Sequence, residues 1–160
     1  MAAILSDQDI ARLIAERKPL PTDYRSKIQL RPKRGHHERE IEVNGTDGNE
    51  FCLILRQSLF NSLDFSIILA YRPLKSNLLF RLRRYNGKSH EHTNPIEGNT
   101  FYDFHVHAAT ERYQELGSRE DTYAEPTVRF ADIHEAISCM LKDCGFEEPF
   151  NSQPSLFEEN

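Results

Sequence analysis

Short apolar or alternating runs follow one another between residues 40 and 107, and turn residues separate them. The runs are EIEV at 40–43, EFCLILRQ at 50–57, DFSIILAYRP at 64–73, LLFRLRRY at 78–85 and TFYDFHVH at 100–107. The separators include NGTDGN at 44–49 and the pair Asn86 and Gly87, which is typical of tight turns between antiparallel strands. This spacing predicts an antiparallel sheet of four or five strands.

From residue 130 the spacing of apolar residues changes to that of a helix. One side of the helix collects Phe130, Ile133, Ile137, Met140, Leu141 and Cys144. Gly145 is a natural end for it. Because strands come first and helices follow, the order indicates an α+β fold. We expect the antiparallel sheet to be covered on one face by C-terminal helices.

Two shorter helices are predicted outside this segment. The first covers residues 7–18, with Ser6 as N-cap and Asp9 three residues later, and the second covers 108–116 and ends at Gly117. A chain of 160 residues has the size of one domain. We expect an N-terminal helix and basic extended arm at 1–39, a single α+β domain at 40–146 and an acidic flexible tail at 147–160.

The composition narrows the class of protein. The formal net charge is −5, so the whole molecule does not attract nucleic acid, and any such contact needs a local basic surface. Three cysteines are too few for a disulfide framework. The chain shows no signal peptide and no apolar run long enough for a bilayer, which indicates a cytoplasmic protein without membrane contact.

Histidines gather around the last predicted strand. His105 and His107 are two residues apart, so they point to the same side of a strand. If this strand pairs with 78–85 and both apolar sets face the helices, Arg81 and Arg83 lie on the same exposed face as the two imidazoles. The connection between the strands adds His92 to this edge.

Such a surface is suited to general acid–base catalysis on RNA or another phosphodiester. Imidazoles exchange protons near pH 7, and arginines bind phosphate. The catalytic candidates are His92, His105, His107, Arg81 and Arg83. The candidates for substrate binding are Lys88, Asn94, Tyr85 and Tyr102. This hypothesis describes a toxin-like endoribonuclease that needs neither a metal nor a cofactor.

Three other interpretations stay open. Arginines and histidines can be purely structural, with Arg83 paired to Asp103 across the strands. A divalent metal site is a further alternative, with His92, His105, His107 and Glu111 as ligands. The last alternative is a non-enzymatic module of a mobile or defence operon that binds a partner protein, and an exposed edge strand at 40–43 also allows a homodimer.

One part of the chain resembles known proteins. The run FRLRRYNGKSHEHTN, the run FHVHAATERYQELG, the YAEPT that follows and the amphipathic helix resemble a group of small uncharacterised bacterial proteins. The resemblance covers about residues 76–145. It implies a bacterial or phage protein inside the cell, and it implies no activity, ligand or catalytic residue.

Overall fold

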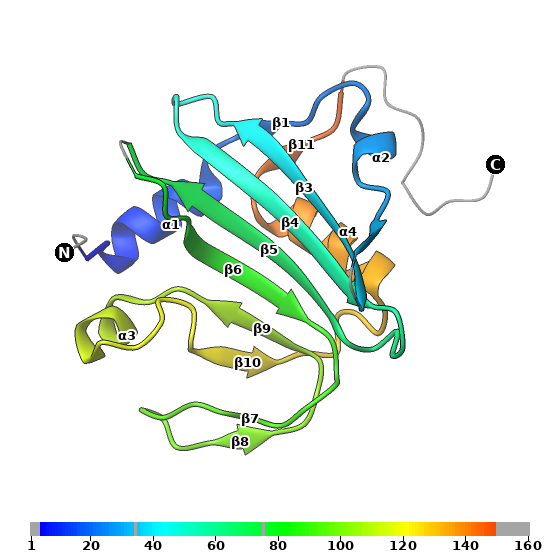
Figure 1. Ribbon diagram of the computed structural model, residues 1–160. Coiled ribbons are helices and arrows are strands. Elements are labelled where there is room, and N and C mark those ends of the chain that lie inside the picture. The colour runs from blue at the N-terminus through cyan, green and yellow to red at the C-terminus, as the bar shows by residue number, and fades with distance from the viewer. Residues whose placement is uncertain (1–3, 34, 75, 150–160) are drawn as a thin grey trace.

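The computed structural model describes residues 4–33, 35–74 and 76–149 (Figure 1). Its centre is an antiparallel sheet of seven strands in the order β10-β9-β6-β5-β4-β3-β2, so the predicted α+β class is confirmed. The longer strands are β3 (His36–Asn44), β4 (Glu50–Ser58), β5 (Phe65–Arg72) and β6 (Phe80–Asn86). The shorter ones are β2 (Arg31–Lys33), β9 (His105–Ala108) and β10 (Ala124–Pro126).

The helices α1 (Asp7–Ala15) and α4 (Ile133–Asp143) lie on one face of this sheet, which we call the helix face (Figure 1). The apolar stripe predicted from residue 130 is buried there. It packs on residues of the central strands that are fully shielded from solvent, namely Phe51, Leu53, Leu55, Ile67 and Leu69. The predicted helix caps are also confirmed, since Ser6 accepts from the Asp9 amide and Gly117 is left-handed.

The helix α3 (Glu111–Leu116) does not join this cover. Its buried Tyr113 donates a hydrogen bond to Glu97 and accepts one from the Ile96 amide, so α3 rests on the loop at 94–99. This loop belongs to a hairpin of β7 (His92–Thr93) and β8 (Thr100–Phe101). The strand predicted at 100–107 is therefore split between β8 and β9.

The N-terminal segment is folded into the domain instead of forming an arm. The short helix α2 (Tyr24–Lys27) and the loops around it bury Leu20, Tyr24 and Ile28 in the core. β2 pairs with the first three residues of β3, and β1 (Lys18–Pro19) pairs in parallel with β11 (Phe146–Glu147). The predicted tail at 147–160 begins inside β11, and its residues from 150 onward lie outside the described part of the chain.

The C-terminal ends of α1 and α4 meet at Lys18. Its ammonium nitrogen lies 2.7–2.9 Å from four carbonyl oxygens, those of Leu13, Ile14, Glu16 and Cys144, which share its three N–H donors. Gly145 has a φ of +77°, and a Cβ there would lie 2.6 Å from the Glu16 carbonyl oxygen. A side chain at this position is thus excluded by both the backbone conformation and the close approach of the two helix ends. No helix in the described ranges is long and apolar enough to span a membrane.

Candidate functional site

A β-bulge in β6 separates the two arginines that strict alternation places together. Leu69 of β5 pairs with Arg83, whereas the next residue, Ala70, pairs with Arg81, so Leu82 is the extra residue. Arg81 and Arg84 therefore lie on the face opposite α4, which we call the open face, while Arg83 lies on the helix face. The prediction that Arg81 and Arg83 share one surface with the imidazoles is wrong for Arg83.

The three predicted histidines do come together, and we call them the histidine cluster. The ring centroids of His105 and His107 are 4.9 Å apart, and that of His92 lies 5.6 Å from His105 and 4.9 Å from His107. Phe101 of β8 also contacts His92 and His105. The hairpin β7–β8 thus packs over the imidazoles of β9, which are only 1% and 4% exposed for His105 and His107.

Backbone carbonyls determine the tautomers of these two rings. Nδ1 of His105 lies 2.7 Å from the Asp103 carbonyl oxygen, and Nδ1 of His107 lies 2.8 Å from that of Asp121. A carbonyl oxygen only accepts, so each Nδ1 carries the proton and each Nε2 keeps its lone pair. Burial is the main cause that lowers the pKa of His105 to about 4 and that of His107 to about 2. Both rings are therefore neutral at pH 7.

Asn94 holds the hairpin against the sheet. Its side-chain amide donates to the Ala124 carbonyl oxygen at 2.8 Å and accepts from the Ala124 amide at 2.9 Å. The same oxygen accepts from Nε2 of His92 at 2.8 Å. Asn94 is buried, and both the oxygen and the nitrogen of its side-chain amide are engaged in these hydrogen bonds. The geometry therefore favours a structural role over the predicted substrate contact.

The arginines beside the cluster already have acidic partners. Asp121 is fully buried, and its carboxylate lies 3.0 Å from Nε of Arg84 and 3.6 Å from Nε of Arg81. Arg81 also lies 3.6 Å from the Glu120 carboxylate. A phosphate at this place would have to compete with two carboxylates for the same donors.

The remaining candidates lie apart from the cluster. Glu111 caps the N-terminus of α1, since its carboxylate accepts from the Asp7 amide, so it does not join the three histidines. No three His, Cys, Asp or Glu side chains of the described ranges are arranged to hold a metal ion. Tyr85 is buried on the helix face and donates to Asp143. Lys88 and Tyr102 do meet, with the ammonium 5.8 Å from the ring centroid, but at the end of the sheet.

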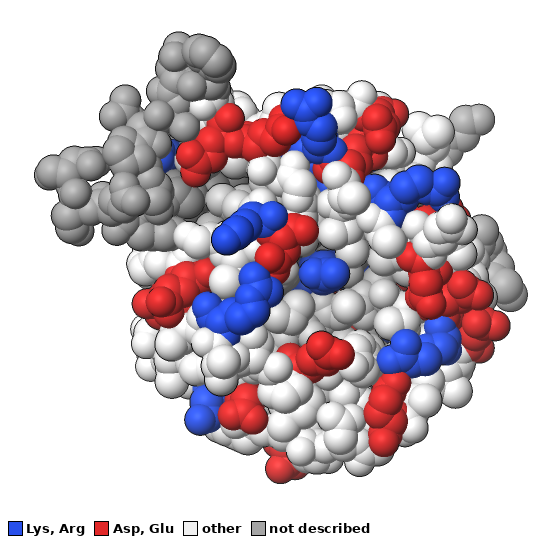
Figure 2. All heavy atoms as spheres, turned by 180° about the vertical axis from the view of Figure 1, so that it is seen from behind, with Lys and Arg blue, Asp and Glu red and all other residues white. Residues whose placement is uncertain are grey.

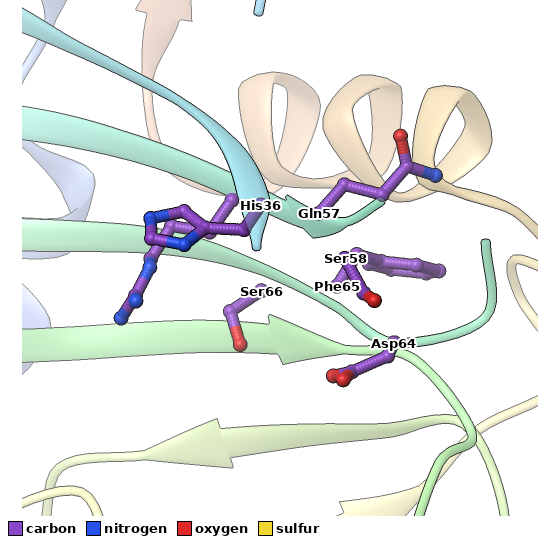
Figure 3. A pocket seen from close by; sticks show the side chains of 7 residues that line it. His36, Gln57, Ser58, Asp64, Phe65 and Ser66 are labelled. Atoms are coloured by element: carbon purple, nitrogen blue, oxygen red, sulfur yellow. The ribbon is translucent and has the colours of Figure 1, made fainter. Parts of the chain in front are cut away.

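The same end of the sheet has a polar pocket that the sequence interpretation missed. We call it the open-face pocket; its cavity volume is about 320 Å³. It is lined by His36, Arg56, Gln57, Ser58, Asp64, Phe65 and Ser66. Figure 3 shows Asp64 and Ser66 on one side of the ribbon, whereas the Gln57 side chain points away from them. Arg56 uses Nε for Glu38 at 3.2 Å.

The loop between β4 and β5 projects next to this pocket and exposes three apolar side chains. Phe60 is 87% exposed, and Leu59 and Leu63 beside it are also exposed; we call these three residues the apolar tip. The loop is held by its own polar groups, because Ser58 Oγ accepts from the amides of Phe60 and Asn61. Asn61 Oδ1 accepts from the Leu63 amide in turn. The signal in the sequence is the apolar content of SLFNSLD at 58–64, which is unusual for a turn.

One comparison with known proteins bears on this chain. A family model described as "Family of unknown function (DUF6978)" matches residues 5–144. This confirms the resemblance to uncharacterised proteins and extends it to α1 and the N-terminal strands. No curated protein and no solved structure matches the chain.

Proposed function

The chain belongs to the DUF6978 family of unknown function, and we propose that it is a protein-interaction module whose contact surface consists of the apolar tip and the open-face pocket. The observation behind this proposal is Phe60, which is 87% exposed on a loop fixed by side-chain hydrogen bonds. Exposed apolar groups that are clustered mark binding surfaces more often than single ones do.

The apolar tip has the features of an interaction anchor. Covering a phenylalanine side chain with apolar surface is worth about 1.5–3 kcal/mol. Because the bonds to Ser58 and Asn61 already hold the loop, little conformational entropy remains to be lost on binding. Rigid aromatic side chains of this kind dominate the affinity of many interfaces.

The open-face pocket indicates the chemistry of the partner. Arg56, Ser66 and His36 are among the residues that line it, and Glu38 lies 3.2 Å from both Nε of Arg56 and Nε2 of His36. Asp64 is the acidic residue of the lining, and its carboxylate already accepts a hydrogen bond from Ser89. We infer a partner segment that puts a carboxylate on Arg56 and surrounds Phe60 with apolar side chains.

Histidine acid–base chemistry is the competing function, and the geometry favours it less. Proton transfer near neutral pH needs a group whose pKa lies close to the working pH and that a substrate can reach. His105 and His107 are buried, and burial moves their pKa values to about 4 and about 2. The arginines on their side of the sheet are paired with Asp121.

Photo-crosslinking from position 60 tests the proposal. With benzoylphenylalanine in place of Phe60, irradiation in an extract of the source cells should give one dominant protein adduct. The matched control has the same residue at Leu116, which is 57% exposed on α3, and should not give this adduct. Against the purified partner, Phe60→Ala should weaken binding about 30-fold, the loss of one anchor worth about 2 kcal/mol, without a change of Tm.

Three results would contradict the proposal. They are equal adducts from positions 60 and 116, adducts with RNA alone, and an unchanged affinity of Phe60→Ala for the crosslinked protein. An adduct that contains only two copies of this chain would assign the tip to self-association instead.

A further inference from the structure

A second pocket lies on the helix face, beside α4, and does not belong to the proposed interaction surface. Its cavity volume is about 520 Å³, which is within the usual range of about 300–1,000 Å³ for small-molecule sites. We call it the arginine pocket; it is lined by Arg83, Tyr85, Val106, Ala108, Tyr123, Glu125, Pro126, Thr127 and Arg129. β6, β9 and β10 form its floor, so it is built on regular structure.

The bulge at Leu82 turns Arg83 into this pocket, where its charge acts on the Asp143 carboxylate without a direct ion pair. Its Nε is buried without a hydrogen-bond partner, and no described carboxylate lies within ion-pair distance of its guanidinium. Arg129 on the same wall differs, because both of its terminal nitrogens bind the Asp143 carboxylate at 2.8 Å. A buried N–H group without a hydrogen-bond partner is costly, unless an anion or a water molecule accepts from it.

The other walls indicate the body of the ligand. Tyr85 and Val106 give apolar surface on the floor, and Pro126 and the Tyr123 ring continue it at the edge. Glu125 supplies a carboxylate to the lining, and this carboxylate accepts a hydrogen bond from the Tyr123 hydroxyl at 2.6 Å. A flat apolar group therefore fits beside a single anionic group at Arg83.

The surface around the pocket argues for a small anion over a polyanion. Figure 2 shows the side of the molecule on which α1 and α4 lie, with positive and negative side chains interspersed and no continuous basic area. A nucleic acid depends on many cations along its backbone, whereas one guanidinium in a cavity is enough for a single carboxylate or phosphate.

We propose that the arginine pocket binds a small aromatic anion, a carboxylate or a phosphate monoester, whose charged group is held by Arg83. This inference rests on the pocket alone and is independent of the interaction at the apolar tip. Phe60 lies in the loop before β5 and Arg83 lies in β6, so variants can separate the two functions.

Binding of simple probes to the full chain tests the inference by ¹H–¹⁵N NMR. Benzoate and phenyl phosphate represent the two chemistries, inorganic phosphate lacks the ring, and benzamide lacks the charge. We expect saturable shifts of amides in β6, β9 and β10 with benzoate or phenyl phosphate, and at least about tenfold weaker binding of the other two probes. Whichever of benzoate and phenyl phosphate binds more tightly identifies the anionic group of the ligand as a carboxylate or a phosphate.

Arg83→Met keeps the length of the side chain and should weaken the binding of the better aromatic anion at least about tenfold. Arg83→Lys should recover part of this affinity. Arg72→Met is the matched control, since Arg72 is half-buried on the other face and paired with Glu42 at 2.9 Å; it should bind like the unchanged protein. The inference is overturned if no probe gives saturable shifts, if the shifts map elsewhere, or if Arg83→Met binds with unchanged affinity.

Discussion

Lys18→Met should lower the free energy of unfolding by about 3–5 kcal/mol at pH 7, more than any other single lysine replacement in the described chain. Lys18 is completely buried, and methionine fills a similar volume without the charge. The loss therefore reports on the ammonium and its hydrogen bonds, not on packing.

The physical reason is that Lys18 satisfies the ends of two helices at once. Leu13 and Ile14 are in the last turn of α1, and Cys144 is the C-cap of α4, so their carbonyls have no partner within the helix. Without the ammonium these oxygens stay buried and unsatisfied, and the favourable charge at both helix C-termini is lost. The ammonium also lies 4.5 Å from the centroid of the Phe51 ring. Although burial lowers the pKa of Lys18 to about 8, it is mostly protonated at pH 7.

Urea unfolding followed by far-UV circular dichroism measures this loss. The control is Lys27→Met, because the Lys27 side chain is 44% exposed and its ion pair with Asp23 is 3.8 Å long; it should change stability by less than about 0.5 kcal/mol. A loss below about 1 kcal/mol for Lys18→Met would show that water replaces the ammonium, and the role assigned to Lys18 would be wrong.

Acid should destabilise the protein well before its carboxylates titrate, by about 4 kcal/mol between pH 7.5 and pH 5. The unfolded chain binds protons on His105 and His107 near pH 6.5, whereas burial keeps the folded pKa values at about 4 and about 2. In this window the unfolded state holds more protons, so stability falls as the pH falls. Each residue contributes a slope that approaches about 1.4 kcal/mol per pH unit.

The double variant His105→Asn and His107→Asn should abolish most of this slope, whatever its stability at pH 7.5. An asparagine amide occupies the position of Nδ1 and can still donate to the carbonyls of Asp103 and Asp121. His90→Asn is the control, since His90 is exposed, and it should keep the full slope. Equal slopes in all three proteins would mean that other groups cause the acid sensitivity.

Much of the fold follows from residue spacing, because burial of one face is a local property of the chain. The stripe that starts at Phe130 becomes the buried side of α4, and the runs at 50–57 and 64–73 become β4 and β5. The N-terminal strands and β10 are too short to show a period. They depend on pairing with distant partners, such as β1 with β11.

The candidate site follows from the sequence only in part. The convergence of His92, His105 and His107 is visible from their spacing, yet their burial depends on the docked hairpin, which is a long-range contact. The bulge at Leu82 cannot be read from RLRR, because any residue of such a run can be the extra one. It decides that Arg84, not Arg83, accompanies the imidazoles on the open face.

The protonation of His105 and His107 decides between a binding module and a histidine catalyst, and long-range ¹H–¹⁵N NMR of the imidazoles measures it directly. Both rings should show the neutral Nδ1–H tautomer from pH 8 down to about pH 5, in line with pKa values of about 4 and about 2. Titration of either ring near its ordinary pKa of about 6.5 in the folded protein would contradict this and restore acid–base chemistry at the histidine cluster.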